Sequence, residues 1–259
     1  MPRTLFIFLI VLALAFTGCR KPTAPVPPPP GFVEVPSGSV SGTPVQAFYM
    51  GIYELTQTAY QEVMGVNPSY FQSVSGGPVE RVSWFKAIEY CNRRSLLEGL
   101  IPCYSYDTYG SNPDDWPEKW NVYSINHSKI HYTPQSDGYR LPTEAEWVQA
   151  ARGGSASHGY IYSGSNDLNE VGWYWDNWGV SQLCTHAVGA LKANELGIYD
   201  MSGNVWEWCW DVYAGSNHIH RGGSWVHAAE ACAISFRSFN DAAYGSHYIG
   251  FRLARNLRP

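Results

Sequence analysis

From residue 171 onward, the chain has almost no helical periodicity, and this feature restricts its fold more than any other. Trp, Gly and Asn recur there between short alternating runs, and Trp206 and Trp208 flank Glu207 in the way that residues alternate along a β-strand. A helical bundle would need apolar residues at three- and four-residue spacing throughout. The 11 Trp, 18 Tyr and 25 Gly among 259 residues favour an irregular fold with an aromatic core instead.

Signals for helices are found in three segments upstream of this region. Thr56 can cap a helix over 57–64, and Thr143 with Glu146 has the spacing of a capping box. Ser83 can cap a longer helix between these two. The side chains expected to face the core from the second and third helices are Trp84, Ala87, Ile88, Cys91, Ser95, Trp147, Ala150 and Ala151.

The remaining chain is expected to form short strands and loops. Residues 32–35 and 48–54 are predicted to be strands, and 99–139 a long loop-like region in which Pro and Gly recur. No internal repeat or second linker follows residue 31, so a single domain is predicted for 31–259. The fold class is therefore α+β, with two or three helices, many short strands and much irregular structure.

The N-terminus is predicted to be an export signal. Arg3 is followed by an apolar run over 5–16 that is too short for a membrane span. The run ends in Phe16-Thr-Gly-Cys19, which resembles a bacterial lipobox, so we predict a signal peptide at 1–18 and lipidation of Cys19. A plain secretory signal with an incidental cysteine is the alternative.

Residues 19–30 are predicted to tether the domain to a membrane. The segment contains five Pro within 25–30, and such a stretch is extended and semi-rigid. A lipid, a stiff spacer and a globular body together predict a membrane-anchored lipoprotein of the outer membrane or cell surface. The net charge of −5 argues against nucleic acid as a partner.

Five cysteines remain if Cys19 carries a lipid. They are Cys91, Cys103, Cys184, Cys209 and Cys232. An exported protein can form disulfides, but an odd number leaves at least one thiol unpaired, and the sequence does not determine the pairing. Cys209 lies between Trp208 and Trp210, which predicts a thiol buried in the core.

Distinctive sequence blocks follow one another over residues 48–255. The second half contains Asp200-Met-Ser-Gly-Asn-Val-Trp-Glu-Trp208, Arg221-Gly-Gly-Ser-Trp225 and Gly250-Phe-Arg-Leu-Ala-Arg255. The upstream blocks are Tyr53-Glu-Leu-Thr-Gln-Thr58, Val63-Met-Gly-Val-Asn-Pro-Ser69, Pro78-Val-Glu-Arg-Val-Ser-Trp84 and Tyr139-Arg-Leu-Pro-Thr-Glu-Ala-Glu-Trp147. In this order they resemble the formylglycine-generating-enzyme (sulfatase-modifying-factor) family. The resemblance implies a C-type-lectin-like fold with little regular structure.

The catalytic residues of that family are only partly present. Its enzymes bind copper through two cysteines shortly after the Arg-Gly-Gly-Ser block, because soft thiolates hold Cu(I). Cys232 matches the second position, but His227 stands at the first, and the three-His module of the iron-dependent branch is missing. We therefore expect no copper and no enzymatic activity. A sulfatase-maturation-type oxidase with an altered metal site is the alternative function.

A calcium site is the other metal prediction that follows from the resemblance. The family pattern would assign as ligands the side chains of Asp200 and Glu207 and the carbonyls of Gly203 and Val205. Calcium takes six to eight oxygens, and waters can complete such a shell. The alternative is a tight turn in which Gly203 adopts a positive φ and Glu207 pairs with an arginine.

The segment 226–248 lies between two of the family's blocks. Its flanks resemble those of variable proteins encoded by diversity-generating retroelements, which use the same scaffold. The resemblance predicts a non-catalytic binding protein whose ligand is a protein or glycan on a host or bacterial surface. The residues expected to be displayed are Val226, His227, Ala228, Ala231, Phe236, Ser238, Phe239, Asn240, Asp241, Ala243, Tyr244, Ser246, His247 and Tyr248.

The same interpretation assigns the residues beneath this surface. Those expected to support it are Trp225, Cys232, Ile234, Arg237, Ile249 and Phe251. Clustered Phe, Tyr and His offer a large contact area at low entropic cost, as antibody binding sites do. The alternative is an ordinary loop and strand whose aromatic residues belong to the core.

Overall fold

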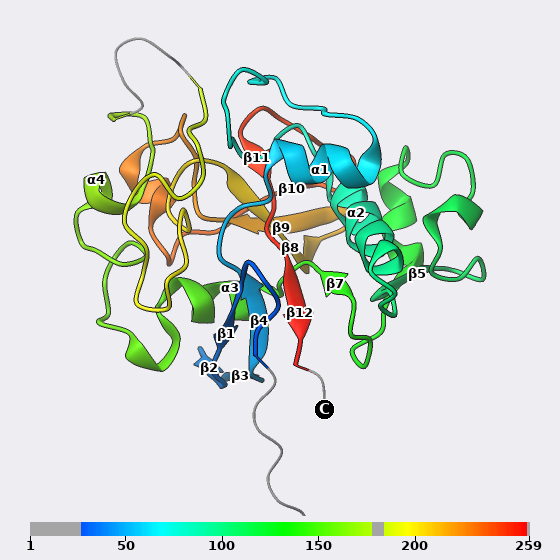
Figure 1. The fold of residues 1–259 in the computed structure, drawn as a ribbon, viewed down its shortest axis with the longest axis horizontal. Coiled ribbons are helices and arrows are strands. Elements are labelled where there is room, and N and C mark those ends of the chain that lie inside the picture. The colour runs from blue at the N-terminus through cyan, green and yellow to red at the C-terminus, as the bar shows by residue number, and fades with distance from the viewer. Residues whose placement is uncertain (1–26, 178–183, 258–259) are drawn as a thin grey trace, which may run out of the picture.

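The two ends of the described chain meet in one sheet. The structure, a computed structural model, describes residues 27–177 and 184–257. The first four-stranded sheet has the order β1 (Phe32–Val35), β4 (Phe48–Gly51), β12 (Ala254–Asn256) and β7 (Tyr139–Arg140). Figure 1 shows β1, β4 and β12 side by side in this sheet. All its strand pairs are antiparallel, and Ala254 lies opposite Met50. A hairpin of β2 (Gly38–Val40) and β3 (Thr43–Val45) lies between β1 and β4 in the chain.

The strand predicted for 32–35 is confirmed, whereas the one predicted for 48–54 ends at Gly51. Leu55 leaves the sheet, because its amide donates to the Phe251 carbonyl at 2.9 Å and its carbonyl accepts from Val79 at 2.7 Å. The chain therefore turns before 54 to meet two distant segments.

The second four-stranded sheet carries the later blocks of the sequence. Its order is β10 (Ser238–Asp241), β9 (Asn217–Arg221), β8 (Trp206–Ala214) and β11 (Ile249–Gly250). The pair β8–β11 is parallel, and the other pairs are antiparallel. Its two edge strands, β10 and β11, lie within and immediately after the segment 226–248.

The three predicted helices are confirmed. They are α1 (Gln57–Met64), α2 (Trp84–Leu97) and α3 (Glu144–Ala151). The hydroxyls of Thr56, Ser83 and Thr143 cap them, and the capping box with Glu146 is formed. All the core-facing residues predicted from α2 and α3 are buried. The described residues also form a further one-turn helix, α4 (Leu168–Val171). These helices, together with the short strands, agree with the predicted α+β class.

The region 99–139 is more ordered than the loop we expected. It contains a two-stranded sheet of β5 (Tyr104–Tyr106) and β6 (Ile130–Tyr132), with the 3₁₀ turns η1 (Pro113–Asp115) and η2 (Ser124–Lys129) between them. The pairing joins segments more than 20 residues apart, so the local sequence pattern does not reveal it. Two further 3₁₀ turns are η3 (Gly154–Ala156) and η4 (Ala229–Cys232).

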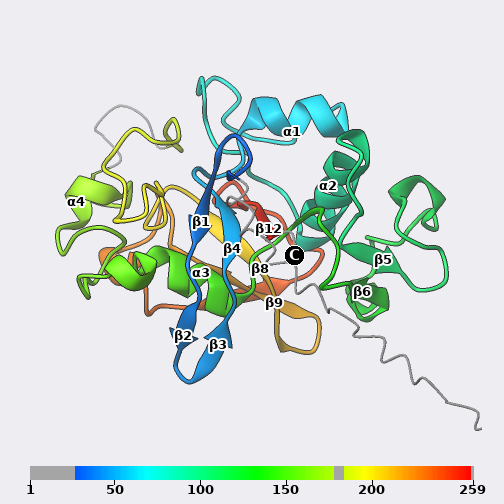
Figure 2. The same cartoon turned by 60° about the horizontal axis from the view of Figure 1, so that its bottom comes forward.

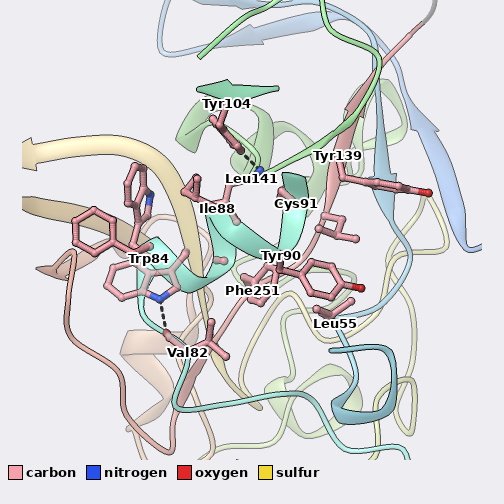
Figure 3. Packing of buried hydrophobic residues seen from close by; sticks show 14 of the residues in the cluster. Leu55, Val82, Trp84, Ile88, Tyr90, Cys91, Tyr104, Tyr139, Leu141 and Phe251 are labelled. Carbon is pink, nitrogen blue, oxygen red and sulfur yellow. Dashed lines mark hydrogen bonds between the residues drawn. The ribbon is translucent and has the colours of Figure 1, made fainter. Parts of the chain in front are cut away.

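An aromatic core fixes α2 against the second sheet. The indole of Trp84 donates to the Cys209 carbonyl at 3.1 Å, and that of Trp208 donates to the Val82 carbonyl at 2.9 Å. Figure 3 shows this cluster, in which the Tyr104 hydroxyl also accepts a hydrogen bond from the Leu141 amide. The indole N–H groups of Trp84 and Trp208 thus both have a partner, which offsets the cost of burying a polar group.

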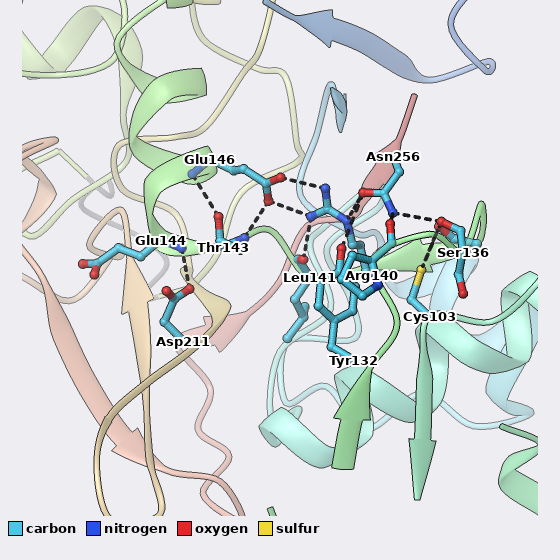
Figure 4. Close-up of polar contacts among 12 residues, drawn as sticks. Cys103, Tyr132, Ser136, Arg140, Leu141, Thr143, Glu144, Glu146, Asp211 and Asn256 are labelled. Carbon is cyan, nitrogen blue, oxygen red and sulfur yellow. Dashed lines mark hydrogen bonds and ion pairs between the residues drawn. The ribbon is translucent and has the colours of Figure 1, made fainter. Parts of the chain in front are cut away.

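The helix α3 connects the sheets. It packs on β2 and β3 from one side and on β8 and β9 from the other (Figure 2). At its N-terminus, Glu146 accepts two hydrogen bonds from Arg140 of β7, at 2.6 and 2.7 Å, and one from the Thr143 amide (Figure 4). The amide of Glu144 donates to Asp211 of β8 at 2.6 Å.

The five cysteines of the predicted domain are all buried, and Cys209 lies in the core as predicted. Cys91, Cys103, Cys209 and Cys232 are free thiols. None of the helices in residues 27–177 and 184–257 has the length and apolar character of a membrane span. The predicted signal peptide, Cys19 and most of the tether lie outside the described residues.

Candidate ligand-binding surface

The segment 226–248 runs around both edges of the second sheet. It follows Trp225, whose amide donates to the Asn204 carbonyl, and passes through η4 into the edge strand β10. It then turns back to β11, where the Trp206 amide donates to the Tyr248 carbonyl at 2.9 Å. Backbone hydrogen bonds hold both ends of the segment, so its side chains are presented from a defined frame.

Most of the residues predicted to be displayed reach the surface. Phe236, Phe239 and Tyr244 are 42%, 41% and 39% exposed. Ala228 and Ala243 are also exposed. The half-buried members are Val226, His227, Ala231, Ser238, Asn240, Asp241, His247 and Tyr248. Their role in binding a ligand stays a prediction.

Two of the expected positions are corrected by the structure. Ser246 is buried rather than displayed, because its carbonyl accepts hydrogen bonds from the amides of Arg81 and Ile249 and draws the residue inward. Arg237 does not lie beneath the surface: its side chain is 46% exposed and pairs with Glu144 at 2.8 Å. The other residues expected to support the surface are buried.

A chain of ring contacts joins the segment to residues outside it. His247 lies 6.1 Å from the ring of Tyr70 and 5.3 Å from that of Tyr248, and Tyr248 lies 5.3 Å from His227. The hydroxyls of Tyr244 and Tyr248 are hydrogen-bonded at 3.0 Å. We call these five side chains, together with Phe236, the aromatic surface.

Three exposed aromatic residues beside the segment were missed by the sequence analysis. Tyr70 is 68% exposed and joins the aromatic surface through its contact with His247, and the amide of Trp175, which is 50% exposed, donates to the His227 carbonyl. Tyr213 of β8 stacks on Phe239 at 3.9 Å between centroids. No local motif marks these residues, since only the folded chain brings them to the segment.

Polar members of the segment are engaged within the protein. Asp241 accepts hydrogen bonds from the hydroxyls of Ser124 and Ser216 and from the amide of Ala243. Burial opposes its ionisation, but these hydrogen bonds outweigh it and lower the pKa of Asp241. Asn240 is hydrogen-bonded to His220 at 2.9 Å. These two residues therefore stabilise the turn, while the aromatic residues provide the free contact area.

His227 and Cys232 stand at the positions of the family's two copper-binding cysteines. Burial raises the pKa of the Cys232 thiol to about 12, and its sulfur packs against Gly223. The thiol lies in an apolar cluster with Leu168, Val171 and Tyr174. A nitrogen of His227 is hydrogen-bonded to the Ser224 hydroxyl at 2.6 Å. One neutral buried thiol does not supply the two thiolates that copper requires.

The predicted calcium ligands are partly engaged by an arginine. Both oxygens of Glu207 accept hydrogen bonds from Arg252 at 2.6 Å, and the indole of Trp147 donates to Glu207 at 2.7 Å. Gly203 has the positive φ of the alternative tight turn, 89°. One Asp200 oxygen accepts from Gly189, and the other is buried without a partner in the described part of the chain.

Glu207 would have to leave Arg252 to bind calcium, so the four predicted ligands do not fit the ion as they stand. Of the two predicted carboxylate ligands, Asp200 has one buried oxygen without a hydrogen-bond partner among the described residues. Within residues 27–177 and 184–257, no group of three or more His, Cys, Asp or Glu side chains is arranged to hold a metal. The calcium site stays a prediction, with Val205 contributing only its carbonyl.

The lectin-like arrangement of two short sheets, few helices and long connections defines the class of this protein. The chain matches the sulfatase-modifying factor enzyme 1-like domain over residues 22–257. It belongs to this family, as the sequence blocks predict.

Individual relatives and a solved structure refine the comparison. The chain is 43% identical to the chaperone protein LppX of Paenibacillus barcinonensis over 81% of this chain and 80% of that protein. It is 32% identical to the formylglycine-generating enzyme of Streptomyces coelicolor, but over only 46% of this chain and 47% of the enzyme. The structure of Treponema denticola variable protein 1 superposes with a TM-score of 0.70 and 33% identity, over 88% of this chain and 93% of that one.

Proposed function

We propose that this protein is a non-catalytic lipoprotein that binds a protein or glycan through the surface built by residues 226–248. The observation that carries the proposal is the arrangement of this segment. The segment provides the edge strand β10 of the second sheet and leads directly into the other edge strand, β11. It exposes Phe236, Phe239 and Tyr244 above the buried residues that support it. Exposed aromatic residues lower solubility, so their clustering at one site is best explained by a partner.

The lack of catalysis is supported by the chemistry of Cys232. The family's oxidation needs two thiolates, and this chain has one buried neutral thiol with histidine at the other position. The alternative, an oxidase with an altered metal site, has weaker support because that histidine nitrogen is engaged by Ser224. Similarity to Treponema denticola variable protein 1 supports the further proposal that residues 226–248 are diversified.

The binding surface can be tested by removing its three most exposed aromatic side chains. We expect the triple variant Phe236→Ser, Phe239→Ser and Tyr244→Ser to lose at least tenfold in binding, since a few aromatic residues carry most of the energy of an interface. Each change should alter the free energy of unfolding by only about 0.5 kcal/mol, because the side chains are exposed. Binding of fluorescently labelled protein to intact epithelial and bacterial cells would be measured by flow cytometry.

A matched control is available at another exposed site. Tyr109, Tyr123 and Tyr160 are 49%, 58% and 36% exposed and lie outside the segment. Their replacement by Ser should leave cell binding unchanged. Equal binding by the two triple variants would contradict the proposed surface, and strong unfolding of the first would show that its aromatic residues belong to the core.

Membrane anchoring through Cys19 is the second part of the proposal. The lipobox-like sequence supports it, and a lipid with a semi-rigid tether would hold the domain away from the membrane. We expect Cys19→Ser to move the protein from the detergent phase to the aqueous phase in a Triton X-114 partition, or to leave its signal unprocessed. A fully processed variant that still partitions into detergent would disprove anchoring at this residue.

A chaperone is a second candidate function. It is favoured by one observation, the 43% identity to LppX over most of both chains. As a chaperone, the protein would use the same aromatic surface to hold apolar segments of an unfolded client. Suppression of aggregation of denatured citrate synthase, lost in the triple variant, would favour this function over recognition of a cell surface.

A further inference from the structure

A cleft with one apolar and one basic wall lies next to the aromatic surface. It has a volume of about 500 Å³ and lies on α1 and α2, which are neighbours in Figure 1. Val63, Met64 and Val66, at the end of α1 and just after it, form the apolar wall. Val66 is 60% exposed, so the wall is open to solvent. No residue of the segment 226–248 lines the cleft.

The opposite wall carries an excess of positive charge. Lys86 and Arg93 both pair with the buried carboxylate of Glu89, at 2.8 and 2.9 Å, and Arg93 also pairs with Asp114 at 2.8 Å. Arg81 is the third cation in the lining, and its guanidinium makes no hydrogen bond or ion pair with any described residue. Three cations and the two carboxylates that pair with them, Glu89 and Asp114, leave one net positive charge, that of Arg81, in the cleft of a protein whose net charge is −5.

The backbone of Arg81 has an unfavourable conformation. Its φ of 61° lies in the left-handed region, which costs a residue with a side chain about 1 kcal/mol or more and suits glycine. The surroundings enforce this conformation, because the Arg81 amide donates to the Ser246 carbonyl at 2.9 Å and Gly245 packs closely on the Arg81 carbonyl. Strain of this kind is concentrated at functional sites.

We propose that this cleft binds an acidic peptide segment of a partner protein that also carries an apolar side chain. A planar guanidinium with free donors matches a carboxylate, with which it can form two parallel hydrogen bonds. Val63, Met64 and Val66 provide contact for a neighbouring leucine or phenylalanine side chain of the peptide. The site does not depend on binding by the segment 226–248, and it predicts a preference for acidic ligands that the aromatic surface does not explain.

The full chain, purified in detergent, can be tested with two fluorescein-labelled hexapeptides. One alternates leucine with glutamate and the other leucine with lysine. We expect the glutamate peptide to bind in fluorescence anisotropy, to bind more weakly as NaCl is raised, and to bind at least tenfold more tightly than the lysine peptide. Equal affinity for the two peptides, or no binding of the glutamate peptide, would overturn the proposal.

Two variants distinguish the contribution of the Arg81 guanidinium to peptide binding from the effect of its strained backbone on stability. Arg81→Gly removes the charge and relieves the strain, so the melting temperature should be unchanged or higher while peptide affinity falls about tenfold. Arg81→Lys keeps the charge and should retain most of the affinity. If Arg81→Gly binds the glutamate peptide as well as the wild type does, the site is wrongly assigned. The Phe236, Phe239 and Tyr244 triple variant should bind the peptide normally, so failure of one proposal can be told from failure of the other.

Discussion

Replacing Arg252 with methionine is expected to lower the free energy of unfolding by about 3–5 kcal/mol, because it leaves a buried carboxylate without its cation. Arg252 and Glu207 are both fully buried and are joined by two hydrogen bonds of 2.6 Å. The guanidinium also donates to the carbonyls of Gly51 and Tyr199, so it links the first sheet to the second. Urea unfolding of the purified protein measures the loss.

The decrease in the free energy of unfolding caused by Arg252→Met should also depend on pH. Burial raises the pKa of Asp200 to about 6, and burial together with Asp200 and Glu207 raises that of Glu54, while Arg252 lowers both. When folding raises the pKa of a carboxyl group, the group stabilises the fold at a pH below its pKa in the unfolded chain, which is about 4. This stabilisation is lost as the pH rises through the pKa of the group in the folded protein. Without Arg252 the pKa values of Asp200 and Glu54 rise further, so Arg252→Met should lose more stability at pH 8 than at pH 5.

An arginine whose ion pair is partly exposed provides the control. Arg94 pairs with Glu98 at 2.9 Å, and the two side chains are 25% and 41% exposed. Arg94→Met should cost about 1 kcal/mol or less, since exposed pairs are screened by water. If Arg252→Met costs no more than Arg94→Met, the buried pair does not stabilise the fold in the way proposed here.

Phe251→Ala is expected to cost about 3–5 kcal/mol, the usual result of removing a phenylalanine from a well-packed core. Phe251 is 1% exposed and contacts the rings of Tyr60 and Tyr90 edge-on, with centroids at 6.4 and 5.5 Å. These tyrosines belong to α1 and α2, so the cavity would loosen both helices against the chain before β12. Thermal unfolding followed by near-ultraviolet circular dichroism reports the change.

The matched variant is Phe239→Ala, in which the same side chain is removed from an exposed position. Phe239 is 41% exposed and contacts Tyr213. Its loss should cost about 0.5 kcal/mol, roughly the limit for surface substitutions. Similar melting temperatures for the two variants would mean that the core around Phe251 can collapse onto the cavity, contrary to expectation.

Part of the candidate site could be predicted from the sequence because its residues adjoin recognisable blocks. The segment 226–248 is delimited by Arg221-Gly-Gly-Ser-Trp225 and Ile249-Gly-Phe251, and its exposed aromatic residues follow from that placement. The exceptions, Ser246 and Arg237, depend on contacts with distant residues: a hydrogen bond from Arg81 and an ion pair with Glu144. Burial of a given side chain depends on such partners, and the segment's own sequence does not identify them.

The sequence by itself determined the three main helices and the family. A cap joins atoms three residues apart, as in Thr143 with Glu146, so the chain defines it before any tertiary contact exists. Only the tertiary structure decided that Glu207 pairs with Arg252 and that Tyr70 joins the aromatic surface. It alone placed Arg81, whose guanidinium has no partner within residues 27–177 and 184–257, in the cleft of α1 and α2. These contacts join residues far apart in the chain, and their distances follow from how the two sheets and the helices pack.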